Sequence, residues 1–205
     1  GGSHTCAIKT DNSLWCWGDN WHGQLGDGTY ESKLSPVQIL QGVSSVSLGG
    51  GHTCAIKTDN SLWCWGYNGY GQLGDGTTGN KSSPVQILQG VSSVSLGGDH
   101  TCAIKTDNSL WCWGRNDYGQ LGDGTTENKS TPVQILQGVS SVSLGGYHTC
   151  AIKTDNSLWC WGWNGAGQLG DGTSGNSKST PVQILQGVSS VSLGGSHTCA
   201  IKTDN

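Results

Sequence analysis

The residues most able to do chemistry are nine cysteines, eight of which form pairs spaced ten residues apart. Zinc sites favour close C-x-x-C knuckles with converging ligands, which this spacing does not supply. We therefore expect disulfides, with free buried thiols less favoured and a metal site least favoured. A bridge that closes so short a loop adds about 2–3 kcal/mol by the chain-entropy model, and it implies an oxidising, extracellular setting for a secreted protein. The paired residues are Cys6, Cys16, Cys54, Cys64, Cys102, Cys112, Cys150 and Cys160, and Cys199 is left over.

One stretch must position these cysteines. HTCAIKTDNSLWCWG occurs whole at residues 4–18, 52–66, 100–114 and 148–162, and its opening returns at 197–205. Two short apolar runs flank Thr-Asp-Asn, which is typical of a β-hairpin whose Asn12 takes the left-handed position of a three-residue loop. If Lys9 then opposes Ser13, Cys6 lies directly opposite Cys16. The register therefore predicts a bridge within each hairpin.

Invariant histidines and aspartates also recur in every repeat. A catalytic site needs different roles for different residues, so repeated copies are better explained by hydrogen bonds that brace loops and turns. The serines lack a nucleophile-elbow context, and the glycines lack a phosphate-loop pattern. We predict no catalytic residue, no cofactor, no metal site and no enzymatic activity. The residues concerned are His4, His52, His100, His148, His197, Asp27, Asp75, Asp123 and Asp171.

The chain of 205 residues is built from near-identical units of about 48 residues, so we expect a single repeat domain over 1–205. No 3.6-residue period is present, and short strands are expected at 43–48, 52–58, 61–65 and 84–88. The predicted fold is all-β, a β-propeller of four-stranded antiparallel blades. The repeats run over 4–51, 52–99, 100–147 and 148–196, followed by a partial fifth repeat at 197–205.

Charge and hydrophobicity exclude several partners. The formal net charge is −4, and the lysines are spread along the repeats, whereas phosphate binding needs a concentrated basic surface. We therefore expect no nucleic-acid partner. No apolar run approaches the roughly 18 residues of a membrane span, so no membrane insertion is expected. The opening Gly-Gly-Ser is neither a start methionine nor a signal sequence, which suggests a processed, excised or engineered piece.

The repeat words GGxHTCA, DNSLWCWG, GQLGDGT and PVQI resemble the regulator-of-chromosome-condensation repeat family, in the Cys-bearing form seen in secreted proteins. The resemblance spans essentially the whole chain. It implies a propeller in which VSSVSL lines the central channel, with HTCAIKT, SLWCWG and PVQIL following outwards. The sequence departs from the family pattern in two ways. It has four repeats, whereas the family usually closes with about seven blades, and it has Asn12 where the family's hairpin turn usually has Gly. The family's chromatin and nucleotide-exchange activity is not carried over, because its functional residues lie outside these words.

Differences between the repeats are confined to the residue before the histidine, the residues after Trp-Gly, and the segment between GDGT and Pro. In a four-stranded blade these connections emerge at one end, so the variable residues share one propeller face. Varied aromatic, charged and small residues on a constant frame have the composition of a paratope. We expect the loop aromatics to be exposed, unlike Trp15, Trp17 and their counterparts. The candidate ligand-binding residues are Ser3, Asp19, Trp21, His22, Tyr30, Gly51, Tyr67, Tyr70, Asp99, Arg115, Asp117, Tyr118, Tyr147 and Trp163.

This pattern favours a binding module that presents variable loops to a protein or glycan ligand. One alternative is that the loops drift without constraint, but drift should also change exposed positions such as Lys9, Gln38 and Ser44, which stay constant in every copy. The other alternative is a structural, self-assembling extracellular repeat protein with no dedicated ligand.

Residues 194–205 duplicate residues 1–12 without a change, so the chain holds one strand too many for a simple ring. The second copy can displace the first, in which case Cys199 takes Cys16 from Cys6. It can instead complete a blade in another chain, or the piece can belong to a longer array. We favour a longer array or a homo-oligomer formed by terminal strand exchange.

Overall fold

The computed structural model describes residues 1–203, and the regular elements of this part are all strands. They match the expected short, turn-separated runs of the repeat. The strands are β1 (His4–Ile8), β2 (Leu14–Gly18), β3 (Lys33–Leu40), β4 (Val43–Leu48), β5 (His52–Lys57), β6 (Leu62–Gly66), β7 (Lys81–Leu88), β8 (Val91–Leu96), β9 (His100–Lys105), β10 (Leu110–Gly114), β11 (Lys129–Leu136), β12 (Val139–Leu144), β13 (His148–Lys153), β14 (Leu158–Gly162), β15 (Lys178–Leu185), β16 (Val188–Leu193) and β17 (Thr198–Lys202).

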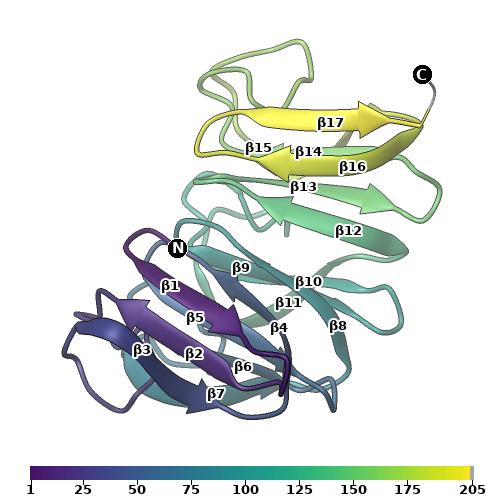
Figure 1. Cartoon of the computed structure of the whole chain (residues 1–205). Helices are drawn as coiled ribbons and strands as arrows, with labels where there is room; N and C mark the ends of the chain where they lie inside the picture. The colour runs from purple at the N-terminus through teal and green to yellow at the C-terminus, as the bar shows by residue number, and fades with distance from the viewer. Residues whose placement is uncertain (204–205) are drawn as a thin grey trace.

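The strands form antiparallel sheets that follow chain order, and three sheets are complete four-stranded blades: β4–β7, β8–β11 and β12–β15. A three-stranded sheet, β1–β3, precedes them, and a two-stranded sheet, β16–β17, follows them. The first strands of successive blades, β4, β8, β12 and β16, lie next to one another. Figure 1 shows the blades as an open arc with β1 and β17 at opposite ends. The predicted propeller architecture is confirmed.

The hairpin register is as predicted. Cys6 lies opposite Cys16 and Ile8 opposite Leu14. Asn12 has a φ of 63°, in the left-handed region, and its amide donates to the Lys9 carbonyl at 2.9 Å. Four disulfides close the hairpins, each over a sequence separation of ten residues. Cys6 keeps Cys16, and Cys199 is free and exposed.

The outermost strand is longer than expected. In the second repeat it begins at Lys81 rather than Pro84, so the proline lies inside the strand. This is tolerated because the strand forms the outer edge of its sheet, where a missing N–H leaves no ladder bond unmade. Of the other expected strands, 43–48 is observed as predicted. The strand expected at 52–58 ends one residue earlier, at Lys57, and the one expected at 61–65 lies one residue later, at Leu62–Gly66.

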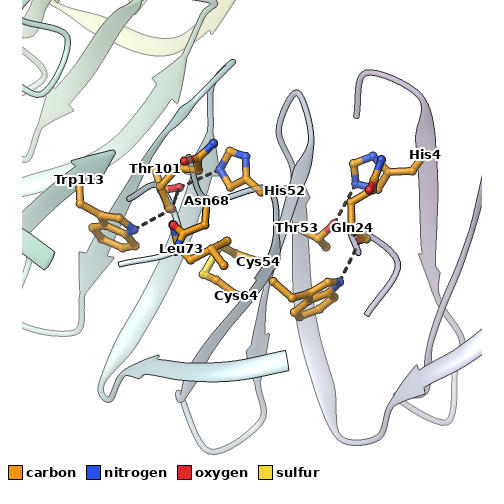
Figure 2. Close-up of a disulfide and its surroundings, with 12 residues drawn as sticks. His4, Gln24, His52, Thr53, Cys54, Cys64, Asn68, Leu73, Thr101 and Trp113 are labelled. Atoms are coloured by element: carbon orange, nitrogen blue, oxygen red, sulfur yellow. Dashed lines mark hydrogen bonds between the residues drawn. A yellow bond between two sulfur atoms is a disulfide. The ribbon is translucent and has the colours of Figure 1, made fainter. Parts of the chain in front are cut away.

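Each blade is fastened to the preceding blade through one loop carbonyl. The carbonyl of Gln24 accepts from Trp65 Nε1 at 3.0 Å and from the Thr53 hydroxyl at 2.8 Å. Because that hydroxyl donates to the carbonyl, it can only accept from His4 Nε2, which lies 2.8 Å away. The next two interfaces repeat this arrangement around the carbonyls of Gln72 and Gln120. Figure 2 shows the first two of these interfaces beside a disulfide.

The two tryptophans of each hairpin have different surroundings. Trp65, Trp113 and Trp161 are fully buried between blades. The expectation that the first tryptophan is also buried is wrong: Trp15 and its counterparts are only partly buried. Lys9 Nζ lies 4.9 Å from the Trp15 ring centroid. The outer strand leaves one side of this ring open, and the lysine covers it.

Candidate binding surface

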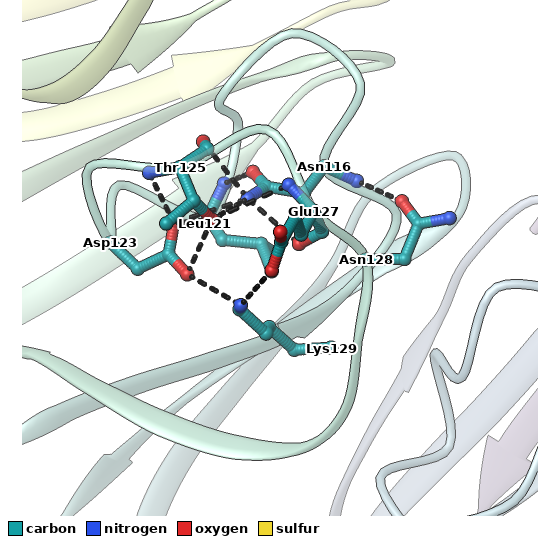
Figure 3. A network of polar contacts seen from close by, with 7 residues as sticks. All are labelled: Asn116, Leu121, Asp123, Thr125, Glu127, Asn128 and Lys129. Atoms are coloured by element: carbon teal, nitrogen blue, oxygen red, sulfur yellow. Dashed lines mark hydrogen bonds and ion pairs between the residues drawn. The ribbon is translucent and has the colours of Figure 1, made fainter.

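The variable residues lie on loops that invariant residues hold in shape. In the third repeat, Asn116 is fully buried and donates from Nδ2 to the carbonyls of Thr125 and Glu127, both at 3.1 Å. The same group donates to Asp123 Oδ1 at 3.1 Å, and Asn116 Oδ1 accepts from the Leu121 amide at 3.0 Å. Figure 3 shows that these contacts converge on the asparagine from both arms of the loop. One buried amide therefore fixes a long loop that has no strand of its own.

Two further invariant contacts complete the brace. Asp123 lies 3.6 Å from Lys129 Nζ at the start of β11. Gln120 Oε1 accepts from the amide of Tyr118 at 3.0 Å, a bond that recurs at the same position in every repeat. The constant residues thus set the backbone on which each variable side chain stands.

Variable side chains from successive repeats contact one another in a continuous row. The ring of His22 lies 4.9 Å from that of Tyr67, and Tyr67 lies 6.2 Å from Tyr70 in an edge-to-face arrangement. The guanidinium of Arg115 lies over Tyr70 at 4.7 Å and over Tyr147 at 5.1 Å. Aromatic and cation–π contacts of this kind each contribute about 0.5–1.5 kcal/mol. Arg115 therefore joins the aromatic residues of two different repeats.

The row ends in an aromatic trio. Tyr147 lies 5.5 Å from Tyr118 and 6.4 Å from Trp163, and the remaining pair is 6.2 Å apart. We call the complete row the loop ribbon. Its members are His22, Tyr67, Tyr70, Arg115, Tyr118, Tyr147 and Trp163.

Two carboxylates orient the arginine at the centre of the ribbon. Arg115 Nε donates to Asp117 Oδ2 at 2.7 Å, and its Nη1 lies 3.4 Å from Asp99 Oδ2. Burial raises the pKa of Asp99, against the hydrogen bond and positive charge of Arg115, which lower it. With its direction fixed on both sides, the guanidinium stays stacked rather than extending into solvent.

The variable positions are also related in pairs, a signal that can be read in the sequence. A Cβ on Gly69 would clash with the Tyr67 hydroxyl, and a Cβ on Gly165 would lie 2.5 Å from the Trp163 ring. Where the first loop residue is a large aromatic that folds back, the residue two places later is glycine. Where the first is Arg115, the residue two places later is its ion-pair partner Asp117. This fit holds in three of the four repeats; the first repeat has Asp19 and Trp21 at these positions.

The other candidate residues lie outside the ribbon. Trp21 and Tyr30 are 79% and 54% exposed. Asp19 accepts from Gln24 Nε2 at 2.8 Å, and Ser3 accepts through its carbonyl from the Asp19 amide. Gly51 leaves room for Tyr67, because a Cβ at this position would lie 3.3 Å from that side chain.

The expected exposure of the loop aromatics is found for only part of the set. Trp21, Tyr30 and Tyr118 are exposed, the last at 38%. Tyr67, Tyr70, Tyr147 and Trp163 are partly buried, because they pack against one another. None is buried between blades in the manner of Trp65.

The invariant histidines are structural groups within the frame. Burial, together with a smaller effect of the nearby histidines, lowers the pKa of His52 and of His100 to about 3. Their Nδ1 atoms are buried and have no hydrogen-bond partner. Within residues 1–203, no cluster of three or more His, Cys, Asp or Glu side chains could hold a metal ion. In that same range, no helix is long and apolar enough to cross a membrane.

A propeller built of such blades, with a variable loop face on a braced frame, defines a class of repeat protein. The family model of the RCC1-like domain matches residues 1–200. This chain belongs to the RCC1-like family. No curated protein sequence compared with the chain matches it.

Solved structures share the fold. Human WBSCR16 superposes with a TM-score of 0.87 at 23% identity, over 98% of this chain and 56% of that one. Prp20p from Saccharomyces cerevisiae superposes with a TM-score of 0.86 at 21% identity, over 98% of this chain and 55% of that one. The CRINKLY ectodomain of the Arabidopsis thaliana receptor kinase ACR4 superposes with a TM-score of 0.58 at 21% identity, over 99% of this chain and 57% of that one. The chain thus spans a little more than half the length of these structures.

Proposed function

We propose that this chain is a protein-binding module whose contact surface is the loop ribbon. The observation that carries the proposal is the continuous row of variable side chains from His22 to Trp163, which crosses successive repeats on a constant frame. Tyrosine, tryptophan and arginine are the residues enriched in the energetic centres of protein interfaces.

Pre-organisation supports the same function. The aromatic rings hold one another, and Asp99 and Asp117 hold Arg115, so little side-chain entropy is lost when a partner docks. The exposed Trp21 and Tyr30 extend the aromatic surface beyond the ribbon.

The related structures support only the class of partner, which is a protein. The structure of Prp20p is described with its binding to Gsp1p and histones, and another with Kap60 bound to yeast RCC1. Those partners belong to those proteins. What we take to this chain is that an RCC1-like propeller can serve as a docking surface for folded proteins.

The proposal places the module in an oxidising, extracellular setting, in keeping with four disulfides and with the receptor-kinase ectodomains that share the fold. It assigns no catalysis to the chain, because the repeated histidines and aspartates are engaged in bracing contacts.

A paired binding screen tests the proposal. The chain and an Arg115→Ala/Tyr147→Ala variant are applied to an array of purified extracellular proteins and to a glycan array. We expect protein ligands whose binding falls at least about tenfold in the variant, because two central contacts of the ribbon are removed. Leu34→Ala is the control, since it removes a large exposed side chain of the outer strand β3 that is not part of the proposed contact surface.

Equal binding by the chain and the double variant contradicts the ribbon as the site. Binding of glycans alone, lost in the same variant, replaces the protein partner with a carbohydrate one.

A further inference from the structure

The constant part of the repeat is electrically neutral. Every hairpin turn carries one lysine and one aspartate, as at Lys57 and Asp59, and every long loop ends with one of each, as at Asp75 and Lys81. In the whole chain these constant positions hold nine lysines and nine aspartates. The formal net charge of −4 therefore belongs entirely to the variable positions. The charged residues at those positions are Asp19, Glu31, Asp99, Arg115, Asp117 and Glu127.

These six residues lie on the face that carries the loop ribbon. Asp99 comes directly before β9, and the other five lie between β2 and β3 or between β10 and β11. Antiparallel strand order places these connections at one end of the blades and the hairpin turns at the other. One face of the molecule thus holds the net negative charge, whereas the charges of the turns cancel.

Two glutamates at the rim of this face share a lysine that already has a carboxylate partner. Lys129 Nζ lies 3.6 Å from Asp123 and 3.3 Å from Glu127, as Figure 3 shows. Glu31 is placed in the same way beside Lys33 in the first repeat. One lysine can neutralise only one carboxylate, so each of these two loops keeps one negative charge, next to an exposed glutamate.

The centre of the loop ribbon has the same imbalance. Arg115 faces two carboxylates, with Nε 2.7 Å from Asp117 Oδ2 and Nη1 3.4 Å from Asp99 Oδ2. The Asp117 side chain is 45% exposed, whereas that of Arg115 is 21% exposed beneath its stacked rings. The charge that a docking partner meets at the centre of the ribbon is therefore negative.

An aromatic ring next to this carboxylate is open to a cation. Tyr118 follows Asp117 directly in the sequence and is 38% exposed. Among the described residues of the ribbon, the cation–π contacts fall on Tyr70 and Tyr147. A ring face beside a carboxylate attracts an ammonium or guanidinium group through both the ring quadrupole and the charge.

We propose that the partner of the loop ribbon is a basic protein, one of whose arginine or lysine side chains docks on Tyr118 beside Asp117. This inference rests on the proposed binding function and adds the charge of the partner. The acidic loops steer a basic surface towards the ribbon, and they repel an acidic one. The aromatic row supplies the contact area, and the variable carboxylates select the partner.

Sorting the ligands of the protein array by charge tests the proposal. The relevant ligands are those that lose affinity in the Trp163→Ala variant, which removes a ribbon ring and leaves the net charge unchanged. We expect these ligands to carry a net positive charge at pH 7. Neutral or acidic ribbon ligands would overturn the basic partner and leave the ribbon as the site. If no protein ligand depended on the ribbon, both proposals would fail.

A pair of isosteric variants locates the effect on one face. Asp117→Asn removes one charge, and its amide oxygen can still accept from Arg115 Nε. The dissociation constant of a ribbon ligand should rise at least about fivefold. Asp107→Asn is the matched control, because it removes the same charge from the hairpin turn of the same blade and can still accept from the Ser109 amide. It should change affinity less than about twofold. Equal effects of the two variants, or no effect of Asp117→Asn, would overturn the assigned contact.

Association kinetics test the steering by the rim. From 0.01 to 0.15 M salt the screening length falls from about 30 to about 8 Å, so the association rate constant of a ribbon ligand, followed by surface plasmon resonance, should fall at least about tenfold. Glu31→Gln/Glu127→Gln should lower the rate constant at least about twofold in 0.01 M salt, with little change in dissociation. An association rate that is independent of salt and of these glutamates would overturn the proposal.

Discussion

Trp161 and Trp163 are two residues apart, yet one belongs to the frame and the other to the loop ribbon. Trp161 is fully buried and donates to the Gln120 carbonyl at 2.9 Å, as its counterparts do in other repeats. Trp163 is partly buried against Tyr118 and Tyr147, which are themselves variable. The partner of a residue therefore decides whether it can vary. A side chain that binds the constant backbone is fixed, whereas one that packs on variable neighbours changes together with them.

The largest effect should come from removing a frame tryptophan. Trp113→Ala opens a cavity between two blades and leaves the Gln72 carbonyl with one donor fewer. We expect the free energy of unfolding to fall by about 3–5 kcal/mol, as measured by urea denaturation at fixed protein concentration. A loss as small as that of a ribbon variant would remove the distinction between frame and ribbon.

Next in size is the loss of one bridge. Replacing both Cys102 and Cys112 with serine should lower the free energy of unfolding by about 2–3 kcal/mol, because the unfolded hairpin is no longer closed. Cys199→Ser is the control, since this thiol is free and exposed. If the control lowered stability as much as the pair, the bridge would not be the cause.

Acidification should weaken the frame through its buried histidines. The pKa of His52 and of His100 is about 3 in the folded chain, against the ordinary histidine pKa of 6.5. The unfolded chain therefore takes up protons first as the pH falls. Stability is full above about pH 6.5 and falls between there and about pH 3, by up to about 1.4 kcal/mol per histidine for each pH unit.

Urea midpoints measured at pH 7.5, 6.5 and 5.5 test this expectation. The carboxylates with lowered pKa, such as Asp75, lose their contribution only below about pH 4, so they do not account for a change within this window. A midpoint that does not change across the window would contradict the neutral, buried imidazoles.

The smallest effect on stability should come from the ribbon. Trp163→Ala removes ring contacts on a partly exposed loop, so the free energy of unfolding should change by less than about 1 kcal/mol. The same substitution should weaken binding of any ligand found in the array screen by at least about tenfold. A large loss of stability would instead make Trp163 part of the frame.

Most of the fold could be predicted because its determinants are local. The Thr-Asp-Asn turn sets the register from Cys6 opposite Cys16 outwards, and the repeat period multiplies that one result into a complete architecture. The face that carries the variable loops follows from strand order alone. Contacts between repeats could not be predicted in the same way, because they depend on distances between side chains that lie far apart in the sequence.

The exposed constant positions show where sequence reasoning fell short. Lys9, Gln38 and Ser44 are exposed, and unconstrained drift is expected to change exposed positions. Lys9 lies over the Trp15 ring, Gln38 Nε2 donates to Gln41 at 3.2 Å, and the Ser44 hydroxyl donates to the Ile56 carbonyl at 3.1 Å. Their constancy thus has a structural cause and gives no support to a selected loop surface. The paired loop positions, such as Tyr67 with Gly69, now carry that argument.

The shared carbonyl at each blade interface has a consequence for how such surfaces arise. Because Gln24, Gln72 and Gln120 offer the same acceptor to the blade that follows, any blade can follow any other with no change in the joint. The ribbon has no such tolerance, since Arg115 stacks on a tyrosine from the blade on each side of its own. Reordering the repeats would therefore leave the scaffold intact and write a different sequence of side chains across its face. The blades are structurally interchangeable, so recombination between nearly identical repeats would create new loop surfaces on the same scaffold.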